Sequence, residues 1–134
     1  MTTEPDFYQE SHLVTAADTA TAFGPEFPAA ASTPFVLGLA EVAAHRSIAA
    51  TFAQGETSVG THSVVDHLAP SPVGAELVIR SRLASRHGKK LEFEIEIFDG
   101  SDLVAVIRHH RAIVNAARIE ARLADRASPR IAPR

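Results

Sequence analysis

A helix of nearly twenty residues, from Thr33 to about Phe52, constrains the fold of this 134-residue chain more than any other segment. Thr33 can cap the helix while Pro34 takes the first helical position, and Gly55 follows its end. Its apolar residues occur on almost every side: Phe35, Val36, Leu37, Leu39, Val42, Ile48 and many alanines. A helix of this kind has to be covered by a sheet on one side and by more protein elsewhere.

Five strand candidates accompany this helix, one before it at 7–16 and four after it. The later four are at about 57–68, 75–86, 91–98 and 103–115, separated by turns rich in glycine and proline. In the segment 91–98, apolar residues alternate with Glu92, Glu94 and Glu96. This alternation is typical of an antiparallel sheet with one buried face and one solvated face.

These elements together predict an α+β hot-dog fold, in which an antiparallel sheet of about five strands wraps around one long central helix. Such a sheet leaves edges and one helix flank uncovered, so we expect a homodimer. Residues 1–127 are expected to form a single domain in which 116–126 is helical, and 128–134 is expected to be a flexible tail.

Composition excludes several classes of function. The formal charge of -3, from 16 acidic and 13 basic residues, argues against nucleic acid and anionic lipid as partners. The absence of cysteine excludes disulfides and thiolate metal sites. The sequence also lacks a signal-like start and a membrane-spanning stretch, and these absences together favour a cytoplasmic location. We expect no metal, because the adjacent His109 and His110 point to opposite faces of a strand.

Three polar residues carry the chemistry that the sequence predicts. Thr33, Glu41 and His67 supply a hydroxyl, a carboxylate and an imidazole, the groups that acyl transfer needs, beside an apolar surface. A carboxylate within an apolar helix is unfavourable unless it is paired or functional. Structural alternatives remain open: Thr33 as a helix cap only, Glu41 in an ion pair with Arg46, and His67 as an ordinary half-buried side chain.

The spacing of these groups raises a geometric question. In a continuous helix Thr33 and Glu41 are about 12 Å apart along the axis, too far for direct contact. Either the first turn is irregular and His67 lies between them, or one working site draws residues from both subunits. We expect His67 to be oriented by Glu41, and the backbone amides near Phe35 and Val36 to stabilise an oxyanion.

Three segments, 33–41, 55–61 and 65–67, resemble the fluoroacetyl-CoA thioesterase family of hot-dog enzymes, and the similarity runs from about 27 to 114. The resemblance implies that Thr33, Glu41 and His67 are catalytic. It implies further that Gly60 and Arg111 belong to the substrate site. It also implies a phenylalanine-rich lid ahead of the helix, where Phe27 stands, and we expect Phe35 to contact substrate as well.

The function implied is hydrolysis of a small acyl-CoA, with coenzyme A as part of the substrate and no separate cofactor. A cluster of basic residues at 80–90 could meet the phosphates of coenzyme A, or could simply be a solvated face. Two alternatives are a hot-dog protein that binds acyl thioesters without catalysis, and a hot-dog hydratase or dehydratase. The second fits poorly, because it calls for an aspartate and a histidine close together on one helix, where this chain has Glu41, His45 and Arg46.

Overall fold

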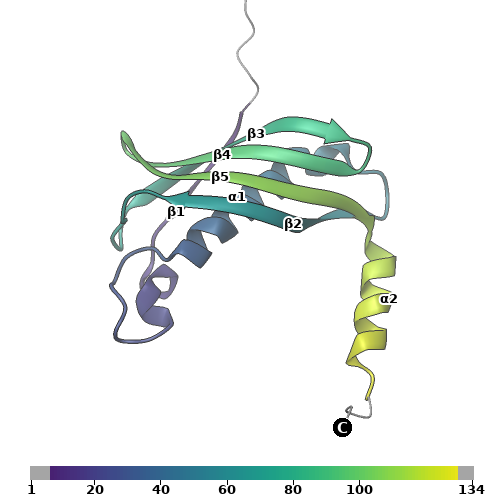
Figure 1. Ribbon diagram of the computed structural model, residues 1–134, viewed down its shortest axis with the longest axis horizontal. Coiled ribbons are helices and arrows are strands. Elements are labelled where there is room, and N and C mark those ends of the chain that lie inside the picture. The colour runs from purple at the N-terminus through teal and green to yellow at the C-terminus, as the bar shows by residue number, and fades with distance from the viewer. Residues whose placement is uncertain (1–6, 130–134) are drawn as a thin grey trace, which may run out of the picture.

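The computed structural model describes residues 7–129, which form one antiparallel sheet with a long helix on one face (Figure 1). The strands are β1 (Tyr8–Leu13), β2 (Glu56–His67), β3 (Glu76–His87), β4 (Lys90–Asp99) and β5 (Asp102–Asn115). Their order across the sheet is β1-β3-β4-β5-β2, so β1 and β2 are the edge strands. The long helix is α1 (Thr33–Ile48), which continues as a 3-10 turn over Ala49–Thr51. The five strands and the long helix agree with the prediction.

The core lies between α1 and the centre of the sheet. The inward residues of β4 are fully or almost fully buried: Leu91, Phe93, Ile95 and Ile97. They belong to the same core as Val36, Ala40, Ala43 and Ala44 of α1. The alanines allow the helix to lie close to the sheet, and burial of each large apolar side chain stabilises the fold by about 1.5–3 kcal/mol.

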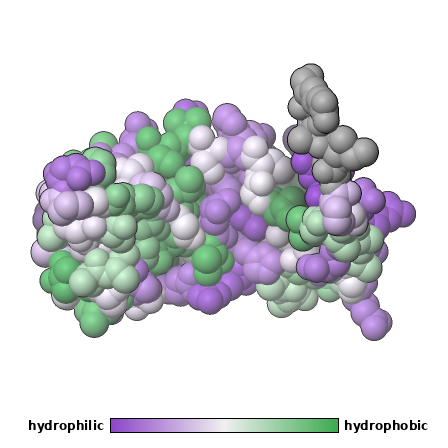
Figure 2. Space-filling model, turned by 90° about the horizontal axis from the view of Figure 1, so that it is seen from below, coloured by the Kyte–Doolittle hydropathy of each residue, from purple (hydrophilic) through white to green (hydrophobic). Residues whose placement is uncertain are grey.

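One flank of α1 stays uncovered within a single chain. Val42 is 43% exposed, and Leu37 and Leu39 are only partly buried. Figure 2 views the molecule from the side that α1 occupies, and apolar residues (green) remain visible there among polar ones. The free edge of β2 and this flank are the features from which a dimer was expected, and the dimer stays a prediction.

A β-bulge in β2 decides which side chains face α1. Gly60 is paired with Arg111, but the next pair joins His62 to His110, so one residue is extra on β2. Cross-strand partners share a face of the sheet. As a result Gly60, before the bulge, and His67, after it, both face the helix, although their odd separation in sequence would otherwise place them on opposite faces.

The C-terminal helix α2 (Ala116–Ala127) follows β5 directly and stands away from the sheet, as Figure 1 shows in yellow. Asn115 caps it by accepting a hydrogen bond from the Arg118 backbone at 3.0 Å, and none of its residues is buried. Of the predicted tail, Ser128 and Pro129 are outside the helix, and 130–134 lie outside the described residues. Between residues 7 and 129, no helix is both long enough and apolar enough to cross a membrane.

Candidate active site

The first turn of α1 differs from the prediction by one residue. Ser32, not Thr33, is the N-cap: its hydroxyl accepts a hydrogen bond from the Phe35 amide at 3.2 Å. Serine is at least as good a cap as threonine, so the types of residue do not by themselves decide which of two adjacent hydroxyls caps the helix. The Val36 amide donates to the Ser32 carbonyl at 2.9 Å. Both amides thus have partners within the first turn, so the predicted oxyanion role of the amides near Phe35 and Val36 gains no support from the structure and stays a prediction.

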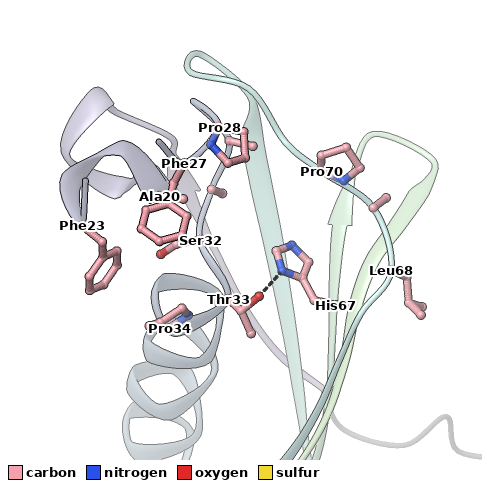
Figure 3. A pocket seen from close by; sticks show the side chains of 13 residues that line it. Ala20, Phe23, Phe27, Pro28, Ser32, Thr33, Pro34, His67, Leu68 and Pro70 are labelled. Carbon is pink, nitrogen blue, oxygen red and sulfur yellow. Dashed lines mark hydrogen bonds between the residues drawn. The ribbon is translucent and has the colours of Figure 1, made fainter. Parts of the chain in front are cut away.

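Capping by Ser32 leaves the Thr33 hydroxyl free for another contact. Thr33 Oγ1 lies 2.8 Å from Nδ1 of His67, the last residue of β2 (Figure 3). The Nε2 atom of His67 is shielded from solvent and has no hydrogen-bond partner among residues 7–129. If Thr33 donates its proton, Nδ1 is the acceptor and Nε2 carries the imidazole proton. A hydroxyl that donates to an imidazole is the arrangement by which enzymes activate an oxygen nucleophile.

A cavity of about 480 Å³ lies over this pair, within the size range of small-molecule sites. Phe23 and Phe27 line it from the loop between β1 and α1, and Leu68 and Pro70 line it from the segment after β2 (Figure 3). None of the described residues that line it is an acid, a lysine or an arginine. The lining is therefore suited to an apolar acyl group, and Phe27 stands where a lid was predicted.

Phe35 is not among the residues that line this cavity. Its ring lies 5.1 Å from that of His12, in a separate groove between α1 and β1. The expected contact between Phe35 and the substrate therefore gains no support from the cavity over Thr33 and His67, and it stays a prediction.

Glu41 lies two turns further along α1 and belongs to a different group of side chains. Its Oε1 atom is 3.7 Å from Nη1 of Arg111 and 3.8 Å from Nε2 of His109, while the side chain is 43% exposed. The alternative in which Glu41 pairs with Arg46 is wrong, because Arg46 binds Glu10 instead at 2.8 Å. The carboxylate thus faces a buried guanidinium and a buried imidazole.

Gly60 makes the position of this carboxylate possible. A Cβ atom on Gly60 would lie 2.1 Å from Glu41 Oε1 and 3.1 Å from His109 Cε1, so no other residue fits without displacing them. Glu41, which was predicted to be catalytic, thus lies beside Gly60 and Arg111, which were predicted to belong to the substrate site. Among the described residues, however, none of the hydrogen bonds or ion pairs joins Glu41 to His67.

Arg111 is only 8% exposed, and several hydrogen bonds hold its guanidinium in place. Its Nε donates to the Ser58 hydroxyl at 2.8 Å, and its Nη2 donates to the Ser58 carbonyl at 3.0 Å. Its Nη1 lies 3.1 Å from His109 Nε2. Behind these partners, His45 Nδ1 is 2.7 Å from the Ser58 hydroxyl, and His109 Nδ1 is 2.6 Å from the Ser63 hydroxyl.

Burial, reinforced by the neighbouring Arg111 cation, lowers the pKa of both His45 and His109. Both imidazoles are therefore neutral at pH 7 and can accept hydrogen bonds. Arg111 itself is buried within the protein rather than solvated at the surface. The adjacent His109 and His110 point to opposite faces, as predicted, with His109 buried and His110 exposed to solvent.

The family of the chain is decided by comparison with known proteins. The family model for fluoroacetyl-CoA-specific thioesterases matches residues 14–117. The chain belongs to this family. A fluoroacetyl-CoA thioesterase from Streptantibioticus cattleyicolor is 33% identical over 98 residues, which are 73% of this chain and 70% of that protein.

Solved structures agree with this assignment. A threonine-to-alanine variant of the fluoroacetyl-CoA thioesterase, in complex with fluoroacetate, has a TM-score of 0.87 at 26% identity and covers 92% of this chain and 97% of that one. A hot-dog-like protein from Thermanaerovibrio acidaminovorans has a TM-score of 0.83 at 22% identity, covering 94% and 93%. The predicted family and the predicted hot-dog fold are both confirmed.

The residues that the resemblance to this thioesterase family implied fall into two groups within one chain. Thr33 and His67 meet at the cavity, whereas Glu41, Gly60 and Arg111 meet beside α1 at the β2–β5 pair. Their catalytic and substrate-binding roles stay predictions.

Sequence reasoning missed Ser58 and Ser63. Both serines lie in a segment that was expected to be half-buried, where a polar side chain often has a partner. This signal is weak, because the sequence does not show how β2 pairs with β5.

The basic residues at 80–90 do not line the cavity of this thioesterase-family chain. Arg82 pairs with Glu94, and Lys89 Nζ lies 3.4 Å from Glu56. These contacts favour the solvated face over a phosphate site.

Proposed function

We propose that this chain hydrolyses the thioester bond of small acyl-CoA substrates, fluoroacetyl-CoA among them. The observation that carries the proposal is the Thr33 hydroxyl at 2.8 Å from His67 Nδ1, beneath an apolar cavity, in a chain of this family. The cavity is larger than an acetyl group needs, so it has room for the acyl group and the adjoining end of the pantetheine arm.

In the proposed reaction, His67 Nδ1 removes a proton from the attacking oxygen, which is either the Thr33 hydroxyl or a water molecule in its place. The oxygen adds to the thioester carbonyl, and the carbon–sulfur bond then breaks. The imidazolium returns its proton to the departing thiolate. Where Thr33 attacks, water hydrolyses the acyl-threonine in a second step. The net products are the carboxylic acid and the thiol of coenzyme A.

We infer that Glu41 acts on His67 across a homodimer. Antiparallel pairing of two β2 edges about Val64, with the extra residue of the bulge again left unpaired, would set Gly60 opposite the partner's His67, and residues directly opposite share a face of the sheet. The carboxylate of Glu41, which rests on Gly60, would then approach the Nε2 proton that has no partner within one chain. The same pairing would cover the free edge of β2 and bring protein toward the exposed flank of α1.

Thiol release from a panel of acyl-CoAs tests the proposed activity. The chain has no cysteine, so a thiol reagent reports only coenzyme A. His67→Ala should abolish turnover while the protein stays folded, and the matched control His87→Ala, at the exposed end of β3, should keep wild-type turnover. An unimpaired His67→Ala variant would refute the assignment.

Two further readouts separate the alternative functions. Binding of acyl-CoA with no thiol release would favour a non-catalytic binding protein. Addition of water to an enoyl-CoA would favour a hydratase.

Mixing two inactive variants tests whether the site is shared. His67→Ala and Glu41→Ala subunits should recover about a quarter of wild-type turnover after exchange, because half of the dimers are mixed and each mixed dimer has one intact site. Light scattering should give the mass of a dimer. If mixing restores nothing, or the protein is a monomer, the shared site is wrong.

A further inference from the structure

Buried and partly buried residues around Arg111 form one continuous hydrogen-bonded group, which we call the Arg111 network: Arg111, Ser58, His45, His109 and Ser63. It joins α1 to the inner faces of β2 and β5. Neither the proposed proton transfer at Thr33 and His67 nor the fold itself requires so many polar groups in this place.

The direction of each hydrogen bond follows from chemistry. Arginine only donates, so the Ser58 hydroxyl and His109 Nε2 are both acceptors toward Arg111. Neutral His109 then carries its proton on Nδ1 and donates to Ser63. Ser58, which accepts from Arg111, is free to donate its own proton to His45 Nδ1. The pattern requires a neutral His109, because its Nε2 has to accept from Arg111, and the lowered pKa of His45 makes that imidazole neutral as well.

The network fixes the guanidinium in position and orientation. Ser58 engages Nε and Nη2 through two different oxygens, and His109 engages Nη1. Three contacts on three nitrogens leave the planar group little freedom to rotate. The Nη1 edge is thereby held toward Glu41, at 3.7 Å.

Stability alone is a poor explanation for this arrangement. Burying a guanidinium beside two imidazoles costs desolvation, and the carboxylate with which it pairs, that of Glu41, is half-exposed and beyond hydrogen-bond distance. Apolar residues of similar volume would stabilise such a site at least as well. Ser81 offers a contrast in the same sheet, because this buried serine has a hydroxyl without a partner among the described residues.

We propose that Ser58 and His45 are positioning residues, which act on the reaction by holding Arg111 against Glu41. The proposal rests on the proposed thioesterase function. Ser58 restrains the guanidinium directly, and His45 restrains Ser58 by accepting its proton. Loss of either frees the Nη1 edge from the orientation that faces Glu41.

The experiment is a double-mutant cycle on thioester hydrolysis, with kcat, KM and Tm measured for each variant. Ser58→Ala should lower kcat by about tenfold or more with little change in KM, because the misplaced group acts mainly in the transition state. In the Arg111→Lys background, Ser58→Ala should lower kcat no further, because lysine lacks the planar guanidinium that Ser58 holds. Ser81→Ala is the matched control and should keep wild-type kcat.

His45→Ala is the second variant, in case Ser58→Ala does not fold. It removes a partly exposed side chain, and its loss of kcat should likewise disappear in the Arg111→Lys background.

Three results would overturn the proposal while leaving the proposed function intact. The first is a Ser58→Ala or His45→Ala variant with a lower Tm and an unchanged kcat, and the second is an Arg111→Lys variant with full activity. The third is a double variant whose loss of kcat is the product of the losses from Ser58→Ala and Arg111→Lys. A wild-type protein that hydrolyses no acyl-CoA would overturn the proposed function, and this inference with it.

Discussion

Replacing Gly60 by alanine tests the role of the Glu41 carboxylate with the addition of one methyl group. The new Cβ would lie 2.1 Å from Glu41 Oε1, and ordinary contact begins at 3.4 Å, so the oxygen has to move by about 1.3 Å. The moving oxygen is the end of a half-exposed, flexible side chain, and the buried His109 ring, at 3.1 Å from the new Cβ, has to move by only about 0.3 Å. The free energy of unfolding should therefore change by less than about 1 kcal/mol.

The catalytic effect should be much larger than the effect on stability. A displacement of about 1 Å at a reacting group costs on the order of a hundredfold in rate, or about 2.7 kcal/mol of transition-state stabilisation. We therefore expect kcat/KM of Gly60→Ala to fall about a hundredfold in the thiol-release assay. Urea unfolding, measured on the same preparation, should show a nearly unchanged midpoint.

Gly38→Ala is the matched control on α1, the helix that carries Glu41. A Cβ on Gly38 meets nothing within 4 Å, so this change should keep activity and stabilise the helix by about 1 kcal/mol. If Gly60→Ala retains full kcat/KM, the position of the Glu41 carboxylate does not matter for the reaction, and the proposed role of Glu41 is wrong.

Three further predictions concern stability and the cavity. Folding lowers the pKa values of His45 and His109, so the unfolded chain binds more protons than the folded chain below about pH 6.5. The free energy of unfolding should therefore be highest above that pH and fall as the pH drops toward 5. Urea titrations at several pH values would show this. Ile95→Ala leaves a hole in the fully buried face of β4 and should cost about 2–5 kcal/mol by the same titration. Phe27→Ala removes an aromatic wall of the cavity, so KM for small acyl-CoAs should rise, which steady-state kinetics would reveal.

The fold could be predicted from sequence because local and global signals agree. The alternation in 91–98 marks β4 as a half-buried strand, and the apolar helix needs a sheet to cover it. The start of α1 was misplaced by one residue because Ser32 and Thr33 are equally suitable caps, and only the structure shows which hydroxyl accepts the Phe35 amide.

The candidate site could be predicted only in part. The types of side chain and the family resemblance pointed to Thr33 and His67. The hydrogen bond between them forms because Ser32 caps the helix and leaves the Thr33 hydroxyl free. The Arg111 network could not be predicted, because Ser58 and Arg111 are 53 residues apart and meet only through the register of β2 against β5. The partner of Glu41 is likewise set by tertiary placement rather than by helical spacing.

The extra residue between Gly60 and His62 makes the length of β2 a constraint in its own right. Deleting the extra residue itself would only remove the bulge and leave Gly60 and His67 on one face. Deleting a residue between His62 and His67, however, would reverse the alternation and turn the imidazole of His67 toward the opposite face. Composition would hardly change, yet the hydroxyl of Thr33 would lose its acceptor. Substitutions on the solvated face of this strand should therefore be tolerated far better than an insertion or deletion between His62 and His67.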